Sequence, residues 1–274
     1  MSRLRLESLN AALVRPALEY LARRPYENVF LAYMVRFSGE GLGQATLLVV
    51  RDGPDICGVA YLGRQIVIAA ENKEAIDALA RRPCTAQDVR MIVGPRQPIL
   101  DYWAQVQGTF AQPRLVRDRQ YVMALERARL RPSASEIEVR TAHPTEWRIV
   151  AENSAQMIAY ELDSDARAAE NFDGNIRLMI DRRLWWVGVV DAKLCFFCNI
   201  GPWSEQTAQL QGIWSPPELR GQGYATQALS GICAALFKHV PTLSLYVNDF
   251  NAAAIALYER VGFQRVGEFT TILF

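Results

Sequence analysis

The chain has 274 residues, of which 50% are hydrophobic and 22% charged, and its formal net charge is +1. This length and composition suit one large or two modest globular domains with a sizeable core. No basic stripe of the kind that binds nucleic acid is present, and no apolar run reaches the roughly 18 to 20 residues of a membrane span. We expect neither nucleic acid nor a membrane as partner. The first residues lack the apolar stretch of a secretory signal, which predicts a cytoplasmic protein.

The five cysteines form an odd and scattered set, which predicts reduced thiols rather than a disulfide framework. Cys195 and Cys198 make a C-x-x-C pair within an expected strand, where an odd separation sends the two side chains to opposite faces. The two histidines, His143 and His239, lie far from each other and from this pair in the sequence. No metal-ligand spacing results, so we expect no metal cofactor.

The first part of the chain, residues 1–125, is expected to form a domain of alternating helices and strands. Apolar periodicity predicts two helices, three strands, a helix, a strand, a helix and a last strand. The expected ranges are, in that order, 8–22, 26–37, 46–50, 56–62, 65–69, 72–81, 89–93, 97–107 and 115–125. Charge, proline and serine then dominate residues 126–137, which we interpret as a linker.

Residues 138–274 are expected to form a second domain with nearly the same order of elements. The expected ranges are a strand at 138–141, helices at 144–160 and 165–182, strands at 184–190, 194–200 and 207–215, a helix at 225–236, a strand at 242–247, a helix at 251–261 and strands at 263–266 and 269–274. Asn251 is expected to cap its helix, and Gly262 to end it in a left-handed conformation. The whole predicts an α+β fold (mixed α/β) repeated in tandem, each copy a mostly antiparallel mixed sheet flanked by helices.

The segment RGQGYA, residues 220–225, links an expected strand to an expected helix. Its small residues allow successive backbone N–H groups to approach an anion at the positive end of the helix dipole, as pyrophosphate binding requires. The corresponding turn of the first domain, within IVIAAENKEAIDAL, has no glycine, no arginine and two early carboxylates. That turn would repel a pyrophosphate.

A second segment, NAAAIALYERVGF at residues 251–263, accompanies this turn. Together they make residues 138–274 resemble the GNAT superfamily of acyl-CoA-dependent N-acetyltransferases, whose signatures are Q/R-x-x-G-x-G/A and an asparagine leading a helix that carries L-Y and ends in G-F. The resemblance implies acetyl-CoA as co-substrate. The cofactor-binding residues that it implies are Ile213, Trp214, Ser215, Arg220, Gly221, Gln222, Gly223, Tyr224, Ala225, Thr226 and Asn251. For Trp214 the alternative is a core aromatic, and for Asn251 an N-cap alone.

The same resemblance implies a catalytic role for Tyr258, which would protonate the departing thiolate. Tyr258 lies two helical turns after Asn251 on the same face, which directs both side chains toward one groove. The alternative is a half-buried packing aromatic. The strand before the glycine turn offers only glutamines where many relatives have a glutamate base. Glu205, Glu161 and Asp163 are the alternatives, and no base is assigned.

These features predict an enzyme that transfers an acetyl group from acetyl-CoA to a primary amine by direct attack in a ternary complex. The acceptor, a small molecule or a peptide, is not identified by the sequence, and neither is the acyl chain length. RRPYENVFLAYMV, residues 23–35, resembles the N-terminal half of bacterial GNAT proteins, which implies a degenerate, non-catalytic GNAT-like domain. The alternative function is a non-catalytic acyl-CoA sensor or scaffold. A homodimer is compatible with the sequence, which leaves the oligomeric state open.

Overall fold

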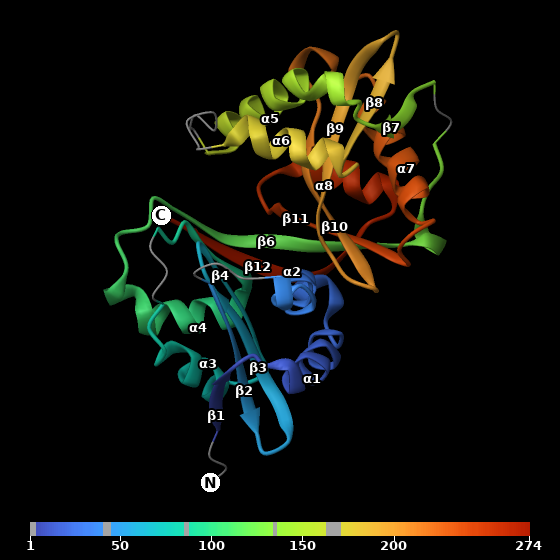
Figure 1. Cartoon of the computed structure of the whole chain (residues 1–274). Coiled ribbons are helices and arrows are strands. Elements are labelled where there is room, and N and C mark those ends of the chain that lie inside the picture. Colours follow the sequence, from blue (N-terminus) through green and yellow to red (C-terminus); the bar gives the residue numbers. More distant parts are fainter. Residues whose placement is uncertain (1–3, 41–44, 85–87, 134–135, 163–170) are drawn as a thin grey trace.

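The computed structural model describes residues 4–40, 45–84, 88–133, 136–162 and 171–274. In this part of the chain one 12-stranded sheet forms the centre, with strands in the order β1-β2-β3-β4-β5-β12-β6-β11-β10-β9-β8-β7 (Figure 1). The strands are β1 Arg5–Ser8, β2 Thr46–Asp52, β3 Asp55–Leu62, β4 Gln65–Ala70, β5 Met91–Pro95, β6 Leu115–Glu126, β7 Glu138–Thr141, β8 Trp185–Val190, β9 Lys193–Trp203, β10 Thr207–Trp214, β11 Thr242–Asn248 and β12 Gln264–Leu273.

Helices cover both faces of this sheet. The α-helices of the described residues are α1 Ala11–Leu21, α2 Pro25–Arg36, α3 Lys73–Ala80, α4 Arg96–Val106, α5 Trp147–Leu162, α6 Phe172–Asp181, α7 Tyr224–Leu236 and α8 Ala252–Val261. In each half two helices precede an antiparallel meander, β2-β3-β4 or β8-β9-β10. A helix then leads to a strand parallel to the third meander strand, β5 to β4 and β11 to β10. The predicted tandem of one α+β fold is confirmed.

The two halves exchange their last strands. β6 belongs to the first half in sequence, yet it pairs with β11 of the second, as in the Met123–Leu245 register. β12 ends the second half, yet it pairs with β5 of the first, as in the Ile92–Ile272 register. β6 and β12 also pair with each other and so join the halves into one sheet. The boundaries at 1–125 and 138–274 stay a prediction, but each half contains a strand of the other.

Two elements differ from the sequence expectation. The last two expected strands are one strand, β12, whose register with β6 shifts between Arg265 and Gly267. Such a bulge admits an extra residue without ending the strand. The edge strand β1 was not predicted, because its four residues are too few to show a period. Among the described helices, none has the length and apolarity that crossing a membrane requires.

Alternating side chains show which helices share a face of the sheet. On β11, Leu245 packs with α7 and α8 while Tyr246 packs with the cluster of α1 and α2. On β9, Cys198 packs with α7 and α8 while Phe197 packs with α5 and α6. Neighbouring strand residues point to opposite faces. The helices α1, α2, α5 and α6 therefore lie on one face, opposite α7 and α8.

The helix α2 extends from the first half over the second. The Tyr33 ring and Phe37, which caps the C-terminus of α2, lie 6.1 and 5.7 Å from the Trp203 ring at the end of β9. Nearby, Arg36 pairs with Glu205 in the turn before β10. The first half thus supplies both a strand and a helix to the surroundings of β10.

Candidate functional site

A left-handed glycine turn connects β10 to α7. After β10 the chain passes a short 3-10 helix, Pro217–Leu219, and reaches Gly221 and Gly223. Their φ angles are +77° and +82°, a region that glycine adopts without the steric cost of a Cβ. Gly223 is the N-cap of α7 and offers no side chain to the helix. The turn therefore requires glycine for its conformation and leaves the helix end uncapped.

The N-terminus of α7 is open toward a ligand. In the described part of the chain, the backbone N–H groups of residues 221–225 donate to no protein acceptor. The N–H groups of Thr226 and Gln227 reach Gly223 O at 3.1 and 3.3 Å. A helix N-terminus carries about half a positive charge, and its free N–H groups point at whatever lies beyond it. This geometry is that of a phosphate-binding helix end.

Arg220 connects the glycine turn to the end of β10. Its Nε donates to Ser215 O at 3.0 Å, and its guanidinium carbon lies 4.4 Å from the centre of the Trp214 ring. The Tyr160 ring, from the last turn of α5, lies 5.5 Å from the guanidinium and 5.7 Å from the Trp214 ring. Trp214 is buried, as its core-aromatic alternative requires. Sequence reasoning missed Tyr160, because no local pattern connects it with a turn 60 residues later.

The strands β10 and β11 part from each other halfway along β10. Their parallel pairing joins residues 207–209 to 242–244, and among the described residues it goes no further. Gly212 has a φ of +58°, and the register with β9 shifts between Gln211 and Trp214. This bulge turns Trp214 toward α5 and α6, while Ile213 packs toward α7. The edge of residues 210–214 therefore has no strand partner on the β11 side and can accept an extended ligand.

Asn251 is the N-cap of α8, the helix that follows β11. The glycine turn and Asn251 thus follow each other along the chain as the two motifs predicted. The Oδ1 of Asn251 accepts from Ala254 N at 3.1 Å, and Gly262 ends the helix with a φ of +115°. Both cap predictions are confirmed. The cap uses only the oxygen of the Asn251 amide, and the amide nitrogen keeps its two donors for another partner.

Tyr258 is buried in the cluster under α7 and α8. It is 6% exposed, and its ring centre lies 5.9 Å from that of Phe263. Its hydroxyl has no hydrogen-bond partner among the described residues. Burial raises the pKa of this phenol, and the charge of Glu161 raises it further. Tyr258 therefore keeps its proton at neutral pH, as a proton donor must.

The three carboxylates that the sequence offers as proton acceptors occupy different places. Glu205 lies in the turn before β10, where its Oε1 accepts from Arg36 Nη1 at 2.9 Å. Glu161 lies in the last turn of α5, where its Oε2 is 3.8 Å from Arg117 Nη2. Burial raises the pKa of Glu161, and the Arg117 charge opposes this rise. Asp163 lies outside the described residues.

The equivalent helix end of the first half is closed. The Oδ1 of Asn72 accepts from Ala75 N at 2.9 Å and thereby caps α3. Glu71 and Glu74 place carboxylates at the same end, and Glu71 is bound by Arg23 at 2.6 Å. A side chain already fills the anion position, and the nearby charges are negative. The contrast with α7 agrees with the expectation that the first half repels a pyrophosphate.

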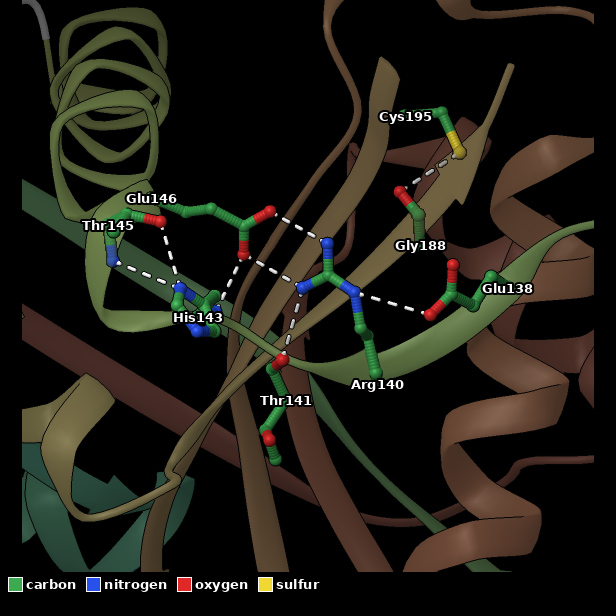
Figure 2. Close-up of polar contacts among 8 residues, drawn as sticks. All are labelled: Glu138, Arg140, Thr141, His143, Thr145, Glu146, Gly188 and Cys195. Atoms are coloured by element: carbon green, nitrogen blue, oxygen red, sulfur yellow. Dashed lines mark hydrogen bonds and ion pairs between the residues drawn. The ribbon is translucent and has the colours of Figure 1, made fainter. Parts of the chain in front are cut away.

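A charged cluster fixes the start of α5, the helix that carries Tyr160 and Glu161. Figure 2 shows the Arg140 guanidinium between the carboxylates of Glu138 and Glu146. Arg140 donates two bonds to Glu146, at 2.7 and 2.8 Å. Glu146 also accepts from the backbone N–H of His143 at 2.6 Å in a capping box. The bonds from Arg140 lower the pKa of Glu146. The cluster stabilises the helix and lies apart from the glycine turn.

The expectation that Cys195 and Cys198 point to opposite faces is wrong. Both thiols pack in the cluster under α7 and α8, because the β8–β9 register shifts between Gly188 and Val189 and Cys195 becomes an extra residue. Cys195 Sγ donates to Gly188 O at 3.3 Å (Figure 2). Burial raises the pKa of both thiols. Among the described residues, no group of three or more His, Cys, Asp and Glu side chains could hold a metal ion.

Two family models match different parts of the chain. Residues 147–263 match the acetyltransferase (GNAT) family, and residues 45–150 match a domain of unknown function, DUF4081. Residues 147–263 thus carry a GNAT acetyltransferase domain, in the half of the chain where the two motifs lie. This domain match supports an acyltransferase that uses an acyl-CoA donor. A search of curated protein sequences finds no match.

Solved structures share the fold over the whole chain. A Drosophila protein is 12% identical with a TM-score of 0.70, and the match covers 98% of each chain. A GCN5-related N-acetyltransferase from Sphaerobacter thermophilus is 18% identical with a TM-score of 0.61, covering 99% of this chain and 95% of that one. A tandem GNAT protein from the clavulanic acid biosynthesis pathway is 16% identical with a TM-score of 0.55, covering 98% of each. The tandem GNAT-like fold is therefore shared along the full length.

Proposed function

We propose that the C-terminal half binds acetyl-CoA along β10 and at the start of α7. The observation that carries the proposal is that the unpaired edge of β10 is followed, after the short 3-10 helix Pro217–Leu219, by the free N-terminus of α7. The free N–H groups of Gly221, Gln222, Gly223, Tyr224 and Ala225 would hold the pyrophosphate, with Thr226 next to them in the first turn of α7. Ile213, Trp214 and Ser215 would bond the pantetheine arm through their backbone, and the free amide donors of Asn251 would meet the cofactor at α8.

The proposed reaction is direct attack of a primary amine on the thioester in a ternary complex. The acceptor nitrogen forms a bond to the acetyl carbon, and the carbon–sulfur bond breaks with its electron pair on sulfur. Tyr258 gives its proton to that sulfur, and burial supports this role because it keeps the phenol protonated. The acceptor would be a small-molecule or peptide amine, delivered from the face of the sheet that α2 and α5 cover.

Replacing Gly223 by Trp tests the donor site. The side chain would stand at the helix end where the pyrophosphate is proposed to lie, so calorimetry should show acetyl-CoA binding lost or much weakened. Gly53→Trp is the matched control, because Gly53 also has a positive φ, +59°, and open space around it. Both variants carry the same backbone strain, but only Gly223 lies at the site. Undiminished binding in Gly223→Trp would refute the site.

A second function, a non-catalytic acyl-CoA sensor, is favoured by one feature of β10. Gln211 Nε2 donates to Gln209 Oε1 at 2.8 Å, so two amides that cannot titrate occupy the strand where many GNAT enzymes place a carboxylate. A sensor would bind acetyl-CoA tightly and acetylate no member of a broad amine panel. An enzyme would release free coenzyme A thiol in proportion to acetylated amine.

A further inference from the structure

The last turn of α5 lies beside the residues of the glycine turn and also contacts the first half of the chain. The Tyr160 ring lies tilted beside Trp214 and near Arg220, next to the glycine turn. The next residue, Glu161, meets Arg117 of β6, the strand that the first half contributes. Arg117 Nη2 donates to the Glu161 carbonyl at 3.2 Å and lies 3.8 Å from its carboxylate. One helical turn therefore connects the proposed donor site to the exchanged strand.

Arg117 is enclosed while Glu161 reaches solvent. The Arg117 side chain is 12% exposed, against 41% for Glu161. The Nε of Arg117 is buried and has no hydrogen-bond partner among the described residues. The guanidinium lies at the C-terminal end of α5, where a helix favours a cation. The enclosed cation can hold the accessible carboxylate in one position.

Glu161 and Tyr258 approach the gap in the sheet from opposite faces. Glu161 lies on α5, whereas Tyr258 packs in the cluster of α7 and α8. The charge of Glu161 nevertheless acts on Tyr258 and on Tyr246 of β11 and raises the pKa of each. The last turn of α5, which carries Glu161, reaches the opening where β10 and β11 are no longer paired, because the ring of the neighbouring Tyr160 lies 5.7 Å from that of Trp214 on β10. A thioester in that opening would have the phenol on one side and the carboxylate on the other.

We propose that Glu161 receives the proton that the acceptor ammonium loses, and that Arg117 of the first half is the positioning residue that holds this carboxylate. The inference rests on the proposed amine acetylation. The ammonium gives one proton to the Glu161 carboxylate and becomes a neutral amine, whose lone pair attacks the thioester carbon. Tyr258 protonates the leaving thiolate and regains a proton from the nitrogen as the amide forms. The net proton leaves from Glu161 to solvent.

The charged and titratable groups around Glu161 agree with this role. Arg117 of β6 contacts it directly, and the charge of Glu161 also acts on Tyr246 of β11 and Tyr258 of α8. The Glu161 side chain is 41% exposed, yet the protein around its carboxylate partly removes water and raises its pKa, which brings the carboxylate nearer to the working pH of a base. Glu205, by contrast, pairs with Arg36 in the turn before β10 and is 81% exposed. Among the described carboxylates that the sequence offered, Glu161 alone acts on Tyr258.

The test compares two amines that differ in protonation. Ethylamine is an ammonium ion at neutral pH and needs a base, whereas methoxyamine is already neutral. In Glu161→Gln we expect kcat/KM for ethylamine to fall about 10²- to 10⁴-fold, as for other general bases, and kcat/KM for methoxyamine to change little. Glu205→Gln is the matched control and should leave both values unchanged. Acetyl-CoA binding, measured by calorimetry, should be equal in all three proteins.

The positioning role has its own variants. Arg117→Met should lower kcat/KM for ethylamine roughly tenfold or more, because a displaced base transfers protons poorly, and should shift its pH profile. Arg117→Lys should recover part of that loss by restoring the charge. Arg119→Met is the control, since Arg119 lies on the same strand but pairs with Asp249. The kcat/KM for methoxyamine should change little in each of these variants.

Three results would overturn the inference. Equal ethylamine kinetics and pH profiles in wild type and Glu161→Gln would remove Glu161 as the base. An equal loss for ethylamine and methoxyamine would show a structural effect instead. Transfer by the wild type to methoxyamine alone would show that the chain has no proton acceptor for an ammonium. The proposed function itself fails in a different way, when wild-type protein binds acetyl-CoA and acetylates neither amine.

Discussion

At the scale of single residues, removal of the Tyr258 hydroxyl tests its proposed catalytic role without disturbing the packing of its ring. Tyr258→Phe removes one oxygen and keeps the ring beside Phe263. Without the proton donor, we expect kcat to fall by about two to four orders of magnitude, with unchanged acetyl-CoA binding. Steady-state release of coenzyme A thiol and calorimetry measure the two quantities. Tyr102→Phe, a buried phenol in the first half, should leave kcat unchanged. Equal turnover in Tyr258→Phe would end the general-acid role.

Single residues also show where sequence reasoning succeeds and where it cannot. The Asn251 cap and the Gly262 stop were predictable, because each depends on backbone groups within four residues. Arg117 was not predictable as a partner of Glu161, because 44 residues separate them and only the exchange of β6 brings them together. The faces of Cys195 and Cys198 were wrongly predicted because one bulge residue reverses the alternation of a strand.

At the scale of elements, the ionised carboxylate of Glu146 at the start of α5 should make the free energy of unfolding depend on pH. Glu146→Gln removes the charge that Arg140 and the His143 backbone bind, which should cost about 1 to 2 kcal/mol of unfolding free energy at pH 7. The pKa of Glu146 is lowered in the folded protein. Its stabilisation is therefore complete above the ordinary glutamate pKa and disappears as the pH falls through the lowered value.

Urea unfolding of wild type and Glu146→Gln at a series of pH values measures this effect. The two free energies of unfolding should differ most near neutral pH and converge in acid, below the ordinary glutamate pKa of about 4.3. Glu19→Gln is a suitable control, since its pair with Arg15 is fully on the surface and should contribute little at any pH. A constant difference across the pH range would contradict a role for the ionised carboxylate.

Comparison of α3 and α7 explains why one half is expected to bind the donor. Both helices follow the third strand of a meander, but Asn72 caps α3 with its side chain whereas Gly223 leaves α7 open. This difference was readable from the sequence, since asparagine and glycine act locally. The pairing of the last strands was not readable. β6 and β12 are both long strands, and the sequence of neither strand indicates with which half of the chain that strand will pair.

At the scale of the whole molecule, the strand exchange predicts that the two halves unfold together. Ile272 lies on β12, at the end of the second half, but it is fully buried in the core of the first half and pairs with Ile92 of β5. Ile272→Ala should destabilise by about 2 to 5 kcal/mol, as large-to-small core changes do. Because β12 and β6 share their hydrogen bonds, the loss should reach both halves.

Native-state hydrogen exchange distinguishes shared from separate unfolding. In Ile272→Ala the slowest amides of β3, in the first half, and of β9, in the second, should lose equal protection, since both exchange through one global opening. Val266→Ala is the control on the same strand, because Val266 is 45% exposed and its removal should cost little. Loss confined to β3 would show that the halves open independently. In that case Arg117 could leave Glu161 without unfolding of α5, and the first half would act on the reaction as a separable unit.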